Sequence, residues 1–503
     1  ITDSSRLSTE EDYSAAIYSK EDLIINGNGT LNVNAGYRNG IKSTDDCIIV
    51  SGTLNITSTE DGIIGKDLCG VVAGDININA GSDGIKSTYD TDTTKGNVII
   101  EGGNITIKAS NDGIQAENIL VINDGAINIK TNNGAADTTQ THIDNMDMGR
   151  GGFGFNNNKT TTTTDDTSES RKGIKAGNML IINDGDITID SDDDSVHCNS
   201  VIYIYGGTIN AATGDDGVHA DDLLTVNGGT INITQCYEGI EADDIVINDG
   251  DISVVSSDDG INSSDGSITI NGGNLLINAS GDGLDANGSI IINGGYIVVL
   301  GPTSDGDTAI DYDDSCTING GTVMAFGSSG MLEIPKGASN GACIVTAFTS
   351  VSGGSKYTLS DSNGNEILSY TPSKAYAAAI VYSDKITTGN TYDITAGSTT
   401  LSIEVTSDVT SNVSSGLGKA GGMNMPGNGG SGMPNNGSSD NGMNGNSNGS
   451  MPDMSGNGAP DMNGNSSGDM PSMGGNSSNN GGNMPNMNNG SSNGSAPQMN
   501  NRM

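Results

Sequence analysis

The chain has 503 residues, a net charge of −42 and only 33% hydrophobic residues, with 76 glycines and no tryptophan. This composition is too polar for one large globular core, and the charge argues against binding to nucleic acid or to anionic membranes. It favours divalent cations as partners, or a highly soluble extracellular protein. No stretch reaches the length of a membrane span, and a start at Ile1 without Met is expected of a processed, secreted protein. We therefore expect a location outside the cell or at its surface.

A repeat of roughly 22 residues runs through most of the chain. Gly217-Val218-His219-Ala220 returns as residues 239–242, and two aspartates follow each copy. Short strands between Gly and Asn turns at this period predict an all-β solenoid of about 12 coils, with three strands in each coil. Side chains alternate in a strand, so Val218 should point inward and His219 outward. Stacking then places equivalent positions of successive coils about 4.8 Å apart.

The chain divides into four predicted segments. Residues 1–22 are the candidate cap of the first coil, and residues 23–335 carry the repeat, with an insertion at 131–171 that is either functional or disordered. Residues 336–410 have longer strand patterns and predict a small β module over the exposed end of the solenoid. Residues 411–503 are rich in Gly, Asn, Ser and Met and predict a disordered tether or sticky tail, which is favoured over copper binding by the methionines.

Two columns of the repeat have a structural interpretation. Positions held only by very small residues, here called anchor positions, indicate a tight bend or a close backbone approach. They are Gly40, Gly62, Gly84, Gly113, Gly173, Ser195, Gly217, Gly239, Gly260, Gly283 and Ala309. The second column is a set of asparagines, each two residues before a Gly, whose stacked amides favour hydrogen bonding along the solenoid over ligand binding. They are Asn123, Asn183, Asn227, Asn248, Asn271, Asn293 and Asn319.

Six cysteines are present, without a CxxC pair that would indicate a zinc site. Cys47 and Cys69 occupy the same place in neighbouring coils, so their spacing suits a disulfide. Packing as small apolar residues inside the coils is the favoured alternative.

Acidic residues gather beside the anchor positions from about Asp192 onward, whereas earlier coils place Lys42 and Lys86 there. Two carboxylates about 5 Å apart repel by roughly 3 kcal/mol at an effective dielectric near 20, so such clusters need an offsetting cation. Calcium fits, because it takes oxygen ligands without strict geometry, although any single Asp is better explained as a hydrated turn residue. The predicted ligands form one cluster of Asp193, Asp194, Asp215, Asp216, Glu241, Asp243 and Asp244, and a second of Asp282, Asp285, Asp311 and Asp313.

Repeated Asp-Gly-Ile/Val-Lys/His/Glu coils, alternating with Ile-Asn-Gly-Gly-x-Ile-x-Ile strands over roughly residues 23–406, resemble the carbohydrate-binding β-helix proteins exported by anaerobic Gram-positive bacteria. The resemblance implies a right-handed parallel β-helix similar to pectate lyases. It also implies calcium and the binding of acidic plant polysaccharides such as polygalacturonate, and of cellulose. It carries over as calcium ligands Asp216, Glu241, Asp243, Asp282 and Asp285. The Met-rich tail and the insertion lie outside this pattern.

The leading hypothesis is therefore calcium-dependent, non-catalytic binding of an acidic polysaccharide. Lys175, His197, His219 and Glu241 are its candidate carbohydrate contacts. One alternative is a structural subunit, or homopolymer, of an extracellular filament or matrix. The other is a calcium-dependent polysaccharide lyase, in which Lys175, Lys172 or Arg171 would remove a proton next to the substrate carboxylate.

Overall fold

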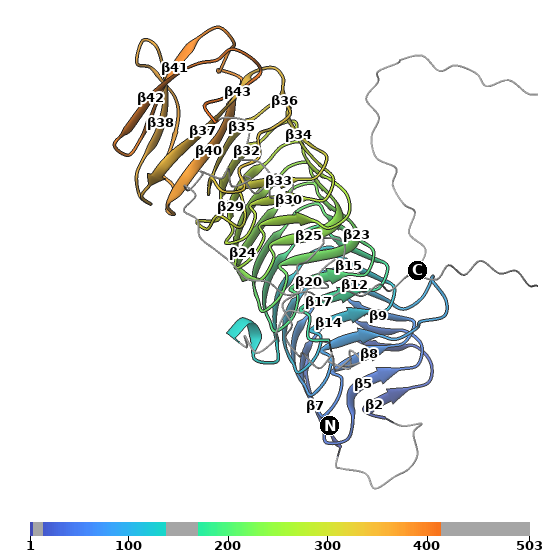
Figure 1. Cartoon of the computed structure of the whole chain (residues 1–503). Helices are drawn as coiled ribbons and strands as arrows, with labels where there is room; N and C mark the ends of the chain where they lie inside the picture. The colour runs from blue at the N-terminus through green and yellow to red at the C-terminus, as the bar shows by residue number, and fades with distance from the viewer. Residues whose placement is uncertain (4–13, 137–169, 414–503) are drawn as a thin grey trace, which may run out of the picture. The chain divides into compact units, whose positions relative to one another are not determined.

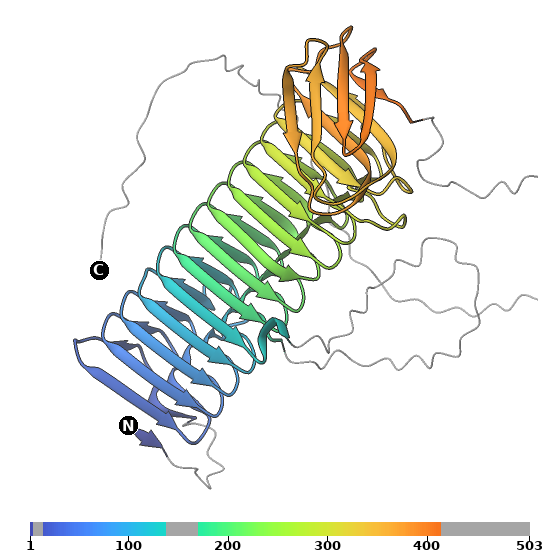
Figure 2. The ribbon, with the colours of Figure 1, turned by 90° about the vertical axis from the view of Figure 1, so that its left-hand side faces the viewer.

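The computed structural model describes residues 1–3, 14–136 and 170–413 and confirms an all-β parallel solenoid, of about 13 turns (Figures 1 and 2). In these ranges the one helical element is a short 3-10 helix, η1 (Gly134–Ala136). No helix of the described residues is long and apolar enough to cross a membrane. The predicted tail beyond residue 413 and most of the predicted insertion lie outside the described residues.

Each coil contributes three strands, which stack into three columns of parallel strands. The long column contains β4 (Thr30–Ala35), β7 (Thr53–Ser58), β10 (Asp75–Ala80), β13 (Asn104–Ala109), β16 (Ala126–Thr131), β19 (Asp186–Ser191), β22 (Thr208–Thr213), β24 (Thr230–Cys236), β26 (Asp251–Ser256), β29 (Asn274–Asn278), β32 (Tyr296–Leu300) and β35 (Thr322–Gly327).

The anchor column starts at or beside the anchor positions and carries the predicted site. It contains β2 (Ala15–Ser19), β5 (Asn39–Ser43), β8 (Ile63–Gly65), β11 (Ile85–Ser87), β14 (Ile114–Ala116), β17 (Ile174–Ala176), β20 (Val196–Cys198), β23 (Val218–Val226), β25 (Ile240–Ile247), β27 (Ile261–Ser263), β30 (Leu284–Ala286) and β33 (Ile310–Tyr312).

The third column follows the anchor column around each coil, and in two coils the strands β23 and β25 continue into it without a break. Its other members are β3 (Leu23–Ile25), β6 (Cys47–Ile49), β9 (Leu68–Val71), β12 (Asn97–Ile100), β15 (Ile119–Ile122), β18 (Met179–Ile182), β21 (Val201–Ile204), β28 (Ile268–Ile270), β31 (Ser289–Ile292), β34 (Ser315–Ile318) and β36 (Gly337–Ala338).

The interior is a stack of aliphatic side chains placed by strand alternation. Val218 is fully buried and His219 is partly exposed, as predicted. Ile56, Ile78 and Ile107 are in register in successive strands of the long column and pack in one core cluster. Buried aliphatic surface is the main source of stability for such a repeat, because each coil can bury it only against its neighbours.

The cysteines are part of this stack. All six are buried and free, and Cys47 is in register with Cys69. The favoured prediction of apolar packing is confirmed, and the disulfide alternative is wrong. Burial raises the pKa of the Cys47 thiol to about 12, so it packs as a neutral group.

The predicted asparagine ladder is confirmed by amide-to-amide hydrogen bonds. Asn183 donates to Asn123 over 2.7 Å, although sixty residues separate them. Bonds of 2.8 to 2.9 Å likewise link Asn227, Asn248, Asn271, Asn293 and Asn319 in sequence order. Tyr205, which takes the position between the two runs, interrupts the ladder.

The segment predicted as a cap contributes strands to the columns. β2 pairs in register with β5, and β1 (Thr2–Asp3) pairs with β4. Across the insertion, β14 pairs directly with β17, so the coils stack there without a gap in register.

The C-terminal module lies against the last coils of the solenoid (Figure 2). Its strand β40 (Tyr376–Ser383) pairs antiparallel with β35, and also with β37 (Ala342–Val351), which in turn pairs with β43 (Val409–Ser411). A four-stranded sheet contains, in spatial order, β39 (Glu366–Tyr370), β38 (Tyr357–Asp361), β41 (Thr391–Ala396) and β42 (Thr399–Glu404). A second core cluster joins this module to the outer face of β32 and β35.

The anchor positions predict a stability effect. A Cβ built on Gly217 would lie 2.5 Å from the Gly239 carbonyl oxygen and 2.5 Å from Ile233 Cδ1. We expect Gly217→Ala to lower the free energy of unfolding by about 1–3 kcal/mol, because backbone and core side chains must shift. Urea unfolding measures this. Gly306→Ala is the control, since a Cβ there meets nothing within 4 Å; equal effects of the two variants would contradict the close approach.

Candidate functional site

A hydrogen-bonded ladder runs along the residues that directly precede the anchor positions. At eight steps, the side-chain Oδ1 of one residue accepts the backbone N–H of the equivalent residue in the next coil. The acceptors are Asn39, Asp61, Asp83, Asp112, Asp194, Asp216, Asp259 and Asp282. The N···O distances to the first seven of these acceptors span 2.6 to 3.2 Å. The predicted acidic column therefore has a structural role, since each carboxylate satisfies a backbone donor that the tight bend would otherwise leave open.

The second carboxylate oxygen of a ladder aspartate faces the side chain three residues later. Asp83 Oδ2 lies 2.7 Å from Lys86 Nζ. Asp194 Oδ2 is 2.9 Å from His197 Nδ1, and the equivalent distance from Asp216 to His219 is 3.0 Å. These three aspartates thus use one oxygen for the backbone of the next coil and the other for a basic side chain of their own coil, whereas Asp61 and Asp112 have Ile64 and Gln115 at that place.

Lys172 replaces the acid at one step of the ladder and supplies a cation to the next coil. Its Nζ lies 2.9 Å from Asp193 and 2.6 Å from Asp194. Burial favours the neutral form of Asp194, but the attraction of Lys172 and the hydrogen bond from His197 outweigh it and hold the pKa well below its usual range. Arg171 similarly pairs with the fully buried Asp192 over 2.7 Å.

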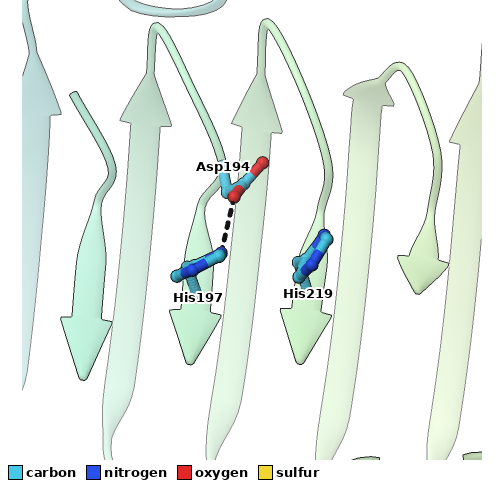
Figure 3. Close-up of side chains that lie close together, drawn as sticks. All are labelled: Asp194, His197 and His219. Atoms are coloured by element: carbon cyan, nitrogen blue, oxygen red, sulfur yellow. Dashed lines mark hydrogen bonds and ion pairs between the residues drawn. The ribbon is translucent and has the colours of Figure 1, made fainter. Parts of the chain in front are cut away.

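In the coil after His197, the side chain of His219 is surrounded by carboxylates of its own coil and of the coil that follows. Its Nδ1 lies 2.8 Å from Glu241 and 3.0 Å from Asp216, and its Nε2 lies 3.4 Å from Asp221. Burial works to lower the pKa of His219, but hydrogen bonds to Asp216 and Glu241 outweigh it and raise the pKa to about 12. The imidazolium is therefore the cation for this cluster. Figure 3 shows His219 beside His197, with their ring centroids 4.9 Å apart.

Basic residues at this place are interrupted by Ile64 and Gln115 in earlier coils, and none follows His219. The residues three positions after Glu238, Asp259 and Asp282 are Glu241, Asn262 and Asp285, so the place of the cation is taken by an acid or an amide. One oxygen each of Asp259, Asp282 and Asp285 lies within 4.8 Å of the others. We call these three residues the late acidic cluster.

Several carboxylates at this end of the face have raised pKa values. Burial, and then the nearby Asp285, raise the pKa of Asp259 to about 8. Burial, with Asp259 and Asp285, also raises the pKa of Asp282 to about 8 although a backbone bond opposes it. Burial and Glu241 raise the pKa of Glu238 to about 8. These carboxylates lack the compensation that keeps Asp194 ionised.

The late acidic cluster fits a calcium ion in its donor chemistry. Carboxylate oxygens are the hard ligands that Ca²⁺ takes, and Asp311, in register with Asp285, offers a further carboxylate in the next coil. From the second predicted cluster the structure brings together Asp282 and Asp285, and it adds Asp259. Asp259 stands in the same sequence column as Asp282, so the repeat pattern could have identified it as a candidate ligand.

The other predicted metal ligands are divided among different surroundings. Asp193, Asp194 and Asp215 lie close together, but Lys172 pairs with the first two. Asp216 and Glu241 share His219. Asp243 and Asp244 lie within β25, where this strand passes from the anchor column into the third column, and they accept bonds from Ser264 and Ser267 of the next coil. Asp313, three coils later, directly follows β33 and is exposed. A further group, which sequence reasoning missed, joins the exposed Asp22 with the half-buried Asp45 and Asp46.

The predicted carbohydrate contacts are engaged mainly with other protein groups. His197 is buried, and its two ring nitrogens contact Asp194 and Asn199. Lys175 Nζ lies 3.2 Å from the Ser170 hydroxyl. Glu241 and His219 contact each other. Direct sugar contact by these four residues stays a prediction.

Comparison with known proteins gives one match. The family model described as carbohydrate-binding domain-containing protein matches residues 1–217 and, in a second match, residues 215–405. No curated protein and no solved structure matches the chain significantly.

The ladder predicts different effects for two substitutions of Asp61. Asp61→Ala removes the acceptor for the backbone N–H of the buried Asp83 and should cost about 1–3 kcal/mol of unfolding free energy. Asp61→Asn should stay close to the parent, because Asn39 already performs this role one coil earlier. Urea unfolding of both variants checks this, and equal losses would contradict the hydrogen-bonding role.

His219 should remain protonated well above neutral pH. We expect the ring carbon and nitrogen chemical shifts of His219 to stay constant from pH 5 to 9 in NMR spectra. Because the folded pKa lies above the ordinary value of 6.5, the stabilisation is complete below pH 6.5 and is lost as the pH rises towards about 12. In the double variant Asp216→Asn, Glu241→Gln the titration should return towards its ordinary range; a parent His219 that titrates near neutral pH would refute the assignment.

Proposed function

The chain belongs to the family of carbohydrate-binding domain-containing proteins, and we propose that it binds acidic polysaccharide through calcium held on the late coils of its anchor column. Its three late carboxylates, Asp259, Asp282 and Asp285, are the ligands from the protein. Uronate groups of the polysaccharide complete the coordination of the ion. The site works outside the cell or at the cell surface, where such polysaccharides lie.

The observation that carries this proposal is the loss of basic partners along one face. Lys86, His197 and His219 each stand three residues after a ladder aspartate and place a side-chain nitrogen within 3.0 Å of its carboxylate. After Asp282 the same place belongs to Asp285, an acid. By repetition of the coils, a cation from solution takes the position that a side-chain nitrogen holds in these three coils.

A calcium ion at this position can bridge protein and ligand. It takes six to eight oxygen ligands, more than three neighbouring carboxylates supply when each gives one oxygen. The remaining positions suit water and the carboxylate of a uronate. A polysaccharide that repeats its carboxylates is attracted to the ion, whereas the bare acidic face would repel it.

The lyase alternative has less support from the face. A general base needs a pKa near the working pH. For Lys172, burial is outweighed by the attraction of Asp194 and Asp193, which raises the pKa above its ordinary value. This lysine is therefore held as a cation.

The filament alternative needs free ends that stack. The last strand of the long column, β35, already pairs with β40 of the C-terminal module. This covered edge favours a binding protein over end-to-end association at that end.

Calorimetry tests the proposal in two titrations of the full chain. The first adds CaCl₂ to chelator-treated protein, and the second adds polygalacturonate with and without calcium. We expect calcium binding, and polygalacturonate binding only when calcium is present. Asp285→Asn should weaken calcium binding by about tenfold or more, equal to about 1.4 kcal/mol, because it removes one charged ligand.

Asp265→Asn is the matched control, since it makes the same charge change at an exposed corner of a neighbouring coil. Equal heats with and without chelator, or equal losses in the two variants, would refute the calcium bridge. A rise in ultraviolet absorbance from unsaturated product would instead identify a lyase.

A further inference from the structure

We propose that a cavity between the last coils and the C-terminal module is a second carbohydrate site, which takes a single neutral sugar residue without calcium. It lies on the outer face of the long column, whereas the late acidic cluster belongs to the anchor column. The proposal thus goes beyond the calcium-dependent site and does not depend on it.

The cavity has a floor from the solenoid and a wall from the module. Tyr296, Thr322 and Ser383 are in register on β32, β35 and β40, and all three line it. The wall is β39, from Glu366 to Ser369. Figure 2 shows the module (orange) against the coils (yellow) that supply this floor.

Tyr296 is the stacking surface of the site. It is 44% exposed, whereas Tyr357 and Tyr376, in the core beneath the module, are buried. A phenol ring offers an apolar face to the C–H groups of a pyranose ring and a hydroxyl to its edge. Such an exposed aromatic ring in a cavity is unusual in this chain, in which aromatic residues make up 4% of the sequence.

Aromatic rings outside the cavity pack between β35 and the module. Phe326, on β35, packs against Tyr370 with ring centroids 6.0 Å apart and against Tyr376 at 5.1 Å. Tyr370 directly follows Ser369 of the cavity wall, so these contacts join the wall to the solenoid.

The polar groups around the cavity suit sugar hydroxyls. Glu366 is held by Lys356 at 2.9 Å and by the Ser369 hydroxyl at 2.6 Å, so its carboxylate is fixed in place. Asp384 and Lys385 follow β40 at the other side and are exposed. With Lys356 paired to Glu366, and Asp384 beside Lys385, the two carboxylates and two lysines leave no net charge here. This balance suits a neutral sugar, whose hydroxyls donate to carboxylates and accept from ammonium groups.

The backbone of β39 adds further hydrogen-bonding capacity. Among the strands that the structure describes, β39 pairs only with β38, so its other edge is open. Unpaired N–H and C=O groups along an edge strand are ready partners for polar ligands.

The size of the cavity limits the ligand. Its volume is about 330 Å³. Ligand pockets span about 300–1,000 Å³, so this cavity is at the lower limit and suits one sugar ring or the end of a chain. A polysaccharide lying along the coils could then be bound at its terminal residue here and along its length elsewhere.

Calorimetry with neutral tetrasaccharides of β-linked glucose, galactose, mannose and xylose, added to the full chain, tests the proposal. At least one should bind equally well with and without chelator. Tyr296→Ala should weaken that binding by about tenfold or more, and Tyr296→Phe should retain most of it, because the ring face is kept. Asp285→Asn should leave it unchanged, which separates this site from the calcium site.

Tyr205→Ala is the matched control, because Tyr205 is 52% exposed but lies after β21 in the third column. Thermal unfolding of each variant verifies that it folds. The proposal is overturned if none of the four tetrasaccharides binds, or if binding survives Tyr296→Ala. It is also overturned if trigalacturonate, and not a neutral sugar, is the ligand that Tyr296→Ala releases.

Discussion

In-register hydrogen bonding between successive coils is the interaction on which the rest of this structure depends. It places each residue directly against the equivalent residues of the coils before and after it, at the spacing of neighbouring strands. For isoleucine and asparagine this repetition is favourable, as the packed row through Ile56, Ile78 and Ile107 and the amide ladder show. For aspartate it is unfavourable, because like charges become permanent neighbours.

The chain meets this conflict by giving the two oxygens of a ladder aspartate separate tasks. One oxygen accepts a backbone N–H from the next coil, which explains why an acid or amide occupies the column at all. The other oxygen faces a basic side chain, as Asp83 faces Lys86. The compensating group stands three residues further on for Asp83, whereas Asp194 also has Lys172 of the preceding coil. Where an acid stands three residues after a ladder aspartate, as Asp285 does, the coil has a further carboxylate at the place that holds a basic residue after Asp83.

Much of the fold follows from the sequence because its signals are periodic. The spacing of the anchor positions, the inward Val218 and the stacked asparagines depend only on strand alternation and register, which the repeat specifies. The site was less predictable because it depends on corners and on side-chain direction. Asp243 and Asp244 follow Glu241 in the same strand, β25, but their carboxylates accept bonds from Ser264 and Ser267 of the next coil. His219 has the residue type of a ligand contact, yet three carboxylates surround it. The cavity between Tyr296 and the C-terminal module joins segments that no repeat relates, so sequence periodicity carries no information about it.

The direct stacking of β14 on β17 has a consequence for how such a protein can change over time. Gln115 and Lys175 are sixty positions apart, yet they are in register on neighbouring strands, as they would be if a short corner joined the two coils. The spacing of these coils therefore does not depend on the number of residues between β14 and β17. New segments can be acquired there, exchanged or lost by gene rearrangement without altering the spacing of charges on the faces that the coils present.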